Sequence, residues 1–108
     1  MSPISTKRGT FHARLRQARL AAGLSQKQLG IQAGIDEFVA STRVNRYEQG
    51  KHQPDFDTAS RIATVLRVPV AYFFASDDRL AELMLAFVAL PKRKQDALLR
   101  MAQDGDAR

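Results

Sequence analysis

LSQKQLGIQAGI (residues 24–35) and TRVNRYEQGKHQP (residues 42–54) are the stretches that decide the fold of this chain. Ser25 is a good N-cap residue for a first helix, and Gly34 tolerates the positive φ with which such a helix ends. A second, polar helix follows and ends near Gly50. Two short helices joined by a glycine turn, the second carrying Ser, Thr, Arg and Asn, form a frame that lays side chains in a DNA major groove.

The charge of the chain is concentrated in its first half. The 108 residues carry a formal net charge of +6; residues 1–54 hold nine Lys and Arg against three acids, whereas residues 55–108 hold eight against eight. A basic half that contains the helical pair favours a polyanionic partner, because neutralised phosphates release counterions and drive sequence-independent attraction. A solubilising surface charge is the alternative interpretation. The length suits one domain with an appended element.

Several classes of function are disfavoured by what the sequence lacks. It contains no cysteine, and His12 and His52 lie far apart, so we expect no metal and no cofactor. No nucleophile paired with a base and no phosphate-cradling glycine loop is visible, so we expect no enzymatic activity. The longest apolar run, residues 83–90, is far shorter than the roughly 20 residues that span a bilayer. Residues 1–9 lack the apolar region of a secretory signal, so we expect a cytoplasmic protein without membrane contact.

Apolar periodicity, caps and prolines predict an all-α fold. Residues 1–9 are typical of a flexible basic arm, and residues 10–75 of a five-helix DNA-binding domain in which Thr10 and Asp55 serve as N-caps. The expected helices of this domain begin near residue 10, residue 26, the residues after 35, residue 55 and residue 69. Residues 76–108 are expected to form a two-helix C-terminal extension interrupted at Pro91.

The C-terminal extension allows two interpretations. Leu80, Leu83, Met84 and Phe87 form one apolar stripe at helical spacing, and the last helix carries a similar stripe. These helices could simply thicken the core of the first domain. Because the DNA-binding unit is complete near residue 75, an apolar appendage more often contacts a partner, and we expect it to form a homodimer interface.

Residues 11–74 resemble the phage-repressor and Cro type of helix-turn-helix domain, the XRE family. The resemblance covers most of a five-helix domain, and it is carried by the order and spacing of short motifs: LRQAR at 15–19, LSQ at 24–26, QL at 28–29, AGI at 33–35, YEQGK at 47–51, Pro54 and AxxLRVP at 63–69. It implies a sequence-specific DNA-binding transcriptional regulator. The simplest form is a dimeric repressor that reads a pseudo-palindromic operator on double-stranded DNA.

The resemblance also implies which residues read bases. Ser41 and Thr42 fall where family members present base-reading side chains, Arg46 is the third such position, and Asn45 lies beside it. Arginine can bind guanine and asparagine can bind adenine through two hydrogen bonds, so Asn45 and Arg46 are expected to carry most of the discrimination. Val44 and Tyr47 alternate with these positions and are expected to face the core.

Other roles implied by the resemblance concern phosphate binding and bracing. Gln26 corresponds to a residue that grips phosphate and braces the recognition helix. Arg43 and Lys51 are assigned to phosphates, one on a flank of the helix and one after its glycine stop. Arg19 and Glu48 match a family pair that clamps the first helix to the end of the recognition helix; two unrelated surface charges are the alternative.

The chain departs from the family pattern between the two central helices. Residues 36–39 are an insertion, which either lengthens the turn or adds an N-terminal turn to the recognition helix, and we favour the added turn with Asp36 as its N-cap. Gly30 stands where the family has alanine; it keeps the side chain small at the helix crossing and weakens the second helix by about 1 kcal/mol.

A protein-interaction role is the rival hypothesis. The domain type also resembles antitoxins, which neutralise a protein partner through an extension and repress their own operon. No toxin-binding segment is recognisable in the sequence, and the C-terminal helices are typical of ordered structure.

Overall fold

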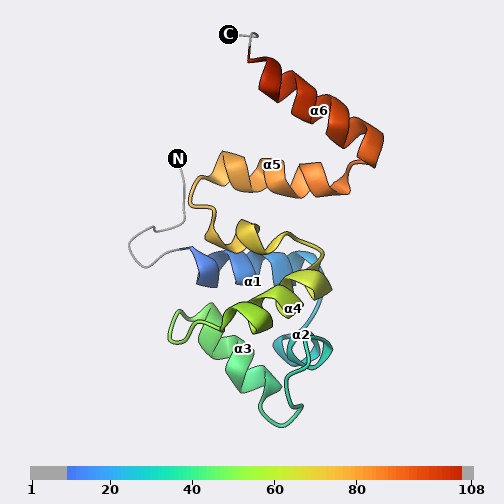
Figure 1. The fold of residues 1–108 in the computed structure, drawn as a ribbon. Coiled ribbons are helices and arrows are strands. Elements are labelled where there is room, and N and C mark those ends of the chain that lie inside the picture. The colour runs from blue at the N-terminus through green and yellow to red at the C-terminus, as the bar shows by residue number, and fades with distance from the viewer. Residues whose placement is uncertain (1–9, 106–108) are drawn as a thin grey trace.

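The computed structural model describes residues 10–105, whose regular elements are six α-helices and one 3-10 helix (Figure 1). The predicted basic arm at residues 1–9 lies outside the described residues. The elements are α1 (Phe11–Ala21), α2 (Gln26–Gln32), α3 (Ala40–Glu48), α4 (Phe56–Leu66), η1 (Val70–Phe74), α5 (Asp78–Ala89) and α6 (Lys92–Asp104). The prediction of an all-α fold is confirmed. No helix within residues 10–105 is both long enough and apolar enough to cross a membrane.

The core is built by the first five elements. Each contributes one of the large side chains with less than 2% exposure: Leu15, Leu29, Val44, Ile62 and Phe73, in chain order. Fully burying one such side chain stabilises the fold by roughly 1.5 to 3 kcal/mol. Phe11 extends the core toward η1, since its ring centroid lies 4.9 Å from that of Phe73. The helix-turn-helix pair is therefore held by α1, α4 and η1 together.

Two of the expected caps have the geometry of an N-cap. The Ser25 hydroxyl accepts the backbone N–H of Gln28, whose side chain accepts the Ser25 N–H in return, which forms a capping box. The Asp55 carboxylate accepts the backbone N–H of Thr58 at 2.9 Å. These bonds satisfy N–H groups that the first turns of α2 and α4 leave without helical partners.

Thr10 precedes α1, but its hydroxyl does not cap the helix. It donates instead to the carbonyl oxygen of Phe73, at 3.1 Å. Thr10 is therefore the N-cap residue, as predicted, but its hydroxyl makes no capping bond because the carbonyl of Phe73 offers a buried acceptor. The Thr10 side chain links the start of α1 to η1.

Arg14 makes a second link from α1 to the C-terminal part of the chain. The residue is 4% exposed; its Nε and Nη2 donate to the carbonyl oxygen of Ala75 at 3.0 and 2.7 Å, and Nη2 lies 3.0 Å from Oδ1 of Asp78 in the first turn of α5. Its guanidinium also lies 5.7 Å from the ring centroid of Tyr72. Arg16, by contrast, is exposed. Arg14, Arg16 and Arg19 cannot all lie on one face of a helix, so at least one of them must point away from the core.

α5 lies beside η1, and α6 extends away from the rest of the molecule (Figure 1). In α5 only Ala81 is buried, and α6 has no buried residue. A side-chain bond joins the two helices, with Gln95 Nε2 donating to the carbonyl oxygen of Phe87 at 2.9 Å. The principal extents of the structure are 52, 31 and 23 Å, and the long one reflects these two helices.

The insertion before α3 lengthens the turn, which corrects the expectation of an added helical turn. The helix begins at Ala40, and Asp36 is not its N-cap; the Asp36 carboxylate accepts the backbone N–H of Phe38 at 2.8 Å, and its carbonyl accepts that of Val39 at 3.0 Å. One more turn of helix would place Asp36 and Glu37 on the buried stripe of Ala40. Two charges cannot be buried there without partners, so the segment forms a turn.

Gly30 allows α2 and α3 to approach closely. A Cβ built on Gly30 would lie 2.7 Å from the Cβ of Ala40, whose side chain is fully buried. The two helices therefore cross where neither can hold a larger side chain. A glycine inside α2 lowers the stability of that helix, and the close contact with Ala40 explains why glycine is found there.

We predict that Gly30→Ala destabilises the protein, although alanine is the better helix former. Helix propensity favours alanine by about 1 kcal/mol, whereas overpacking costs about 1 to 3 kcal/mol, so we expect a net loss of about 1 kcal/mol. Urea denaturation measures the change. Ala40→Gly should lower the stability less in the Gly30→Ala background than in the wild type, because there it removes the Cβ with which the introduced alanine clashes. If the losses of the two substitutions simply added, the contact at the helix crossing would be contradicted.

Candidate nucleic-acid interface

α3 divides into a buried stripe and an exposed one. Ala40, Val44 and Tyr47 are 0%, 0% and 7% exposed, so the prediction that Val44 and Tyr47 face the core is confirmed. Of the predicted base-reading residues, Ser41, Thr42 and Arg46 are exposed and Asn45 is half-buried. These residues lie on the sides of α3 that do not face the core. The helix is therefore fixed along one side and accessible along the other.

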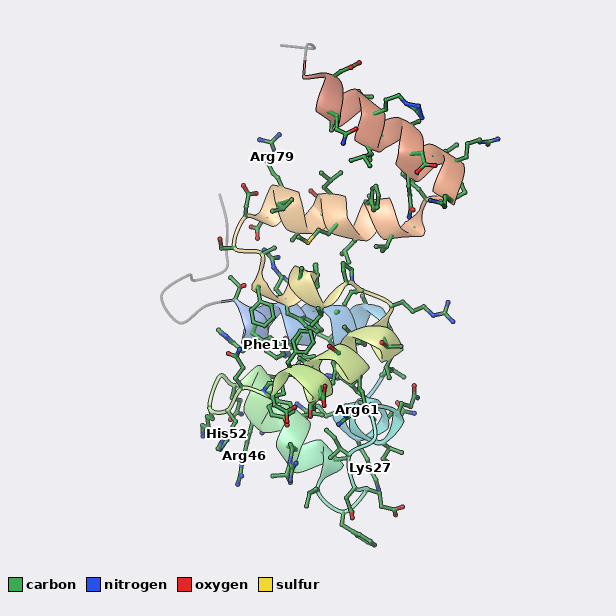
Figure 2. All side chains as sticks on the ribbon, in the orientation of Figure 1. Phe11, Lys27, Arg46, His52, Arg61 and Arg79 are labelled. Atoms are coloured by element: carbon green, nitrogen blue, oxygen red, sulfur yellow. The ribbon has the colours of Figure 1, made fainter. Side chains whose placement is uncertain are left out.

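The basic side chains around α3 lie at the end of the molecule opposite α6. Figure 2 shows Arg46 and His52 projecting outward together, with Lys27 of α2 at the same end. Arg43 and Lys51, the predicted phosphate ligands, are also exposed. A DNA duplex approaching this end would meet positive charge from α2, α3 and the segment after α3.

The position of Lys51 is set by the end of α3. Gly50 has φ of +74°, and the backbone N–H of Lys51 donates to the carbonyl oxygen of Arg46 at 3.0 Å. This is the glycine-terminated closure that satisfies the last carbonyls of a helix. It turns the chain so that Lys51 follows directly on the exposed side of α3.

A groove of about 570 Å³ runs beside the exposed stripe, between α3, the segment that follows it and the start of α4. Its walls combine basic and hydrogen-bonding groups with one acid: Val39, Thr42, Arg43, Arg46, Tyr47, His52, Gln53, Pro54, Asp55 and Thr58. The pKa of Asp55 lies below its ordinary value of 3.8, chiefly because the backbone N–H of Thr58 donates to it. Asp55 therefore stays ionised at neutral pH and stays committed to capping α4.

The groove is a feature that the sequence reasoning missed. Gln53 and Thr58 line it although neither was singled out, and His52 lies on its wall as well. The signal in the sequence was the Pro54-Asp55 pair, which brings the start of α4 back beside α3.

A buried ion pair fixes the end of α3. Arg19 Nε lies 2.5 Å from Glu48 Oε2, Nη2 lies 3.0 Å from Oε1, and Nη1 donates to the carbonyl oxygen of Leu24 at 2.9 Å. The two side chains are 10% and 3% exposed. The hydrogen bond to Glu48 raises the pKa of Arg19, with the charge of Glu48 acting in the same direction and burial acting against it. The structure thus brings together the two residues that the resemblance paired.

Gln26 joins this pair to α3. Its Nε2 donates to Asn45 Oδ1 and to Glu48 Oε1, both at 3.1 Å. Both amide hydrogens are thereby used inside the protein. Gln26 has the geometry of a brace for α3, and a phosphate contact from its side-chain amide would require it to release or share one of these bonds.

Asn45 is oriented by the same contact. Because its Oδ1 accepts from Gln26, its Nδ2 group faces away from Gln26. A carbonyl oxygen has two lone pairs, so Oδ1 can still accept a second hydrogen bond. While bound to Gln26, Asn45 therefore still has the donor and the acceptor that two-point recognition of adenine requires.

No group of three or more His, Cys, Asp or Glu side chains in residues 10–105 is placed to hold a metal ion. What the site offers is a rigid, polar, basic helix face. A short helix, a turn and an exposed polar helix, held against a helical core, define the class of helix-turn-helix DNA-binding proteins.

The Helix-turn-helix family model, HTH_3, matches residues 15–73, and the chain belongs to this family. The XRE-type resemblance is confirmed. The crystal structure of transcriptional regulator BswR matches with a TM-score of 0.81 at 44% identity, over 86% of this chain and 92% of that chain. The crystal structure of the restriction-modification controller protein C.AhdI from Aeromonas hydrophila matches with a TM-score of 0.55 at 28% identity, over 65% of this chain and all of that chain. A search of curated proteins found no match.

The two structural matches differ in how far they extend. A match over 86% of the chain must include part of α5 and α6, because residues 76–108 alone make up more than a quarter of the sequence. The family and these neighbours support a function as a DNA-binding transcriptional regulator.

We predict that breaking the Arg19–Glu48 pair from one side costs about 3 to 5 kcal/mol, because it leaves a buried charge without a partner. Arg19→Met and Glu48→Met should each show this loss in denaturant unfolding at neutral pH. The double variant should lose clearly less than the sum, since no lone charge remains. Because the pKa of Arg19 is raised in the folded protein, the contribution of Arg19 to the free energy of unfolding is present below the ordinary arginine pKa and is lost only in strong alkali. This contribution should therefore not change with pH around neutrality. Additive losses would argue against a coupled pair.

Proposed function

We propose that the protein is a sequence-specific repressor that binds a pseudo-palindromic operator as a homodimer, with α3 of each copy in the major groove. The observation that carries the proposal is the exposed polar stripe of α3 opposite a fully buried one. Such a helix can enter a groove about 12 Å wide without loss of its own packing. The hydroxyl, amide and guanidinium groups of this stripe are types that can bond base edges, which supports the proposal.

Four of the five exposed or half-buried polar residues of α3 are proposed to read bases, and the fifth, Arg43, is proposed to contact phosphate. Arg46 projects outward and can bind O6 and N7 of guanine, and Asn45 presents its amide beside it. Ser41 and Thr42 lie about one turn earlier, at the N-terminal end of the helix. Short hydroxyls at that end can bond base edges or phosphate.

Gln26, Arg43 and Lys51 are proposed to contact phosphates on either side of the groove. Arg43 and Lys51 are exposed on the flank and just beyond the end of α3. For Gln26, the bonds to Asn45 and Glu48 make bracing its primary role, with phosphate contact secondary. Phosphate contacts supply sequence-independent affinity and fix the register in which α3 lies.

Dimerisation through α5 and α6 is supported by the apolar side chains that these helices leave exposed within one chain, among them Leu83, Val88 and Leu99. A groove of about 440 Å³ between these helices is lined by apolar residues only: Pro69, Leu80, Leu83, Met84, Phe87, Val88, Leu98, Leu99 and Ala102. An isolated helix as short as α6 is marginal in water, so packing must come from elsewhere. We assign that packing to a second copy, whose twofold would place the α3 helices about 34 to 36 Å apart.

Mutation can distinguish residues that contact bases from residues that contact phosphates. We expect Arg46→Ala to cost about 1 to 3 kcal/mol of binding free energy and to relax preference at one base pair. Lys51→Ala should weaken binding to all sequences alike and reduce the slope of log affinity against log salt by about 1. The measurements are selection of bound sites from random DNA and binding titrations at several salt concentrations.

The control for these variants is Arg100→Ala, which removes an exposed charge from α6. It should change neither base preference nor salt slope. If Arg46→Ala weakened all sequences equally, Arg46 would be a phosphate ligand. A wild-type affinity that did not fall with salt would contradict docking on phosphates.

The dimer is tested by placing a charge in the apolar groove. Leu99→Asp should convert the dimer to a monomer in sedimentation at micromolar concentration and lower the affinity for a two-half-site operator, because an unpaired charge cannot be buried at the interface. Leu20 of α1 has nearly the same exposure, 52% against 50%, and lies outside the groove, so Leu20→Asp is the matched control and should remain dimeric. A wild-type monomer with and without DNA would contradict the proposal, and a stoichiometric complex with an unrelated small protein would favour the antitoxin alternative.

A further inference from the structure

Phe38 is the most exposed large apolar side chain among residues 10–105. It is 88% exposed and lies in the turn of residues 36–39, between α2 and α3. A single exposed apolar residue is unremarkable on a protein surface. Its position immediately before the recognition helix is what requires explanation.

The turn that carries Phe38 is held in a defined conformation. The Asp36 carboxylate accepts the N–H of Phe38 itself, at 2.8 Å, and the Asp36 carbonyl accepts that of Val39. On either side the chain is anchored, because Ile35 and Ala40 are buried. The backbone of Phe38 is thus positioned by two hydrogen bonds and two core contacts.

The turn lies at the end of the molecule that carries the proposed DNA-binding residues. Figure 1 shows the connection between α2 and α3 at the end farthest from α6. Phe38 precedes Ser41 by three residues, which an extended chain spans in about 10 Å. When the N-terminal end of α3 approaches base edges, the Phe38 ring comes within reach of the same groove.

The neighbours of Phe38 select which part of DNA it can contact. Asp36 and Glu37 are both acidic and exposed, so phosphates would be repelled from the turn. Base edges in the major groove offer one apolar group, the C5-methyl of thymine, and phenylalanine is a side chain that packs against it.

We propose that Phe38 is a specificity-determining residue that packs against a thymine methyl in the major groove, one contact per half-site. The inference rests on the proposed DNA-binding function and adds to it a reader outside the helix. It also gives the insertion at residues 36–39 a role: the lengthened turn adds an aromatic apolar contact to the polar stripe of α3.

Replacing thymine with uracil tests this contact, because it removes the methyl group and leaves base pairing intact. The probe is the duplex that wild-type protein selects from random DNA, with each thymine replaced in turn. We expect one position per half-site at which uracil weakens wild-type binding about fourfold, the value for losing one buried methyl group. In Phe38→Ala this penalty should disappear. Because the variant dimer lacks the contact in both half-sites, its affinity for the unmodified duplex should fall about sixteenfold, to about that of wild type for a duplex with uracil at both positions.

Two further variants separate this contact from general effects. Phe74→Ala removes a 52% exposed phenyl from η1, and it should retain every uracil penalty of the wild type. Phe38→Leu keeps an apolar group and should retain part of the penalty. If Phe38→Ala retained all wild-type uracil penalties, or if wild type showed none, the inference would be overturned while the proposed function stood. A wild-type protein that selected no sequence from random DNA would overturn the proposed function itself.

Discussion

The buried pair of Arg19 and Glu48 is the constraint on which the recognition surface depends. Glu48 is the last residue of α3, and its two oxygens accept hydrogen bonds from Arg19 and from Gln26. Burying such a pair contributes little net stability, because desolvation offsets attraction, but an alternative orientation of α3 would leave a charge buried alone. The pair therefore fixes one orientation of the helix. Since Gln26 also holds Asn45, the same network orients a side chain proposed to read bases.

α1 connects the two ends of the molecule. Near its C-terminal end Arg19 holds α3, and near its N-terminal end Arg14 holds Ala75 and the first turn of α5, with Thr10 holding η1. Both arginines are nearly buried, so neither can rotate freely into solvent. A rigid helix with one such clamp at each end relates the direction of α5 to that of α3. The geometry of any interface formed by α5 and α6 is then transmitted to the spacing of the DNA-binding faces.

Much of the fold followed from the sequence, because caps, glycines and apolar spacing act locally. Ser25, Asp55 and Gly50 end or begin helices as their chemistry requires, and the burial of Val44 and Tyr47 follows from helical periodicity. The turn at residues 36–39 was not predicted, although the same periodicity places Asp36 and Glu37 on the buried stripe of Ala40 in an added turn. The acceptors of Thr10 and Arg14 lie more than 60 residues away, beyond any local signal. The DNA contacts, including those of Arg43 and Arg46, remain predictions.

No residue of α6 is buried within its own chain, and this affects how transcription responds to the concentration of the protein. If α6 gains its packing from a second copy, as we propose, the ordered form of the C-terminal helices becomes more populated as the protein accumulates. Below the dissociation constant of the dimer, the concentration of the form able to occupy both half-sites then rises as the square of the total protein concentration. Transcriptional output would change over a narrower interval of protein abundance than a monomeric binder allows, so a modest change in synthesis or proteolysis would suffice to switch it.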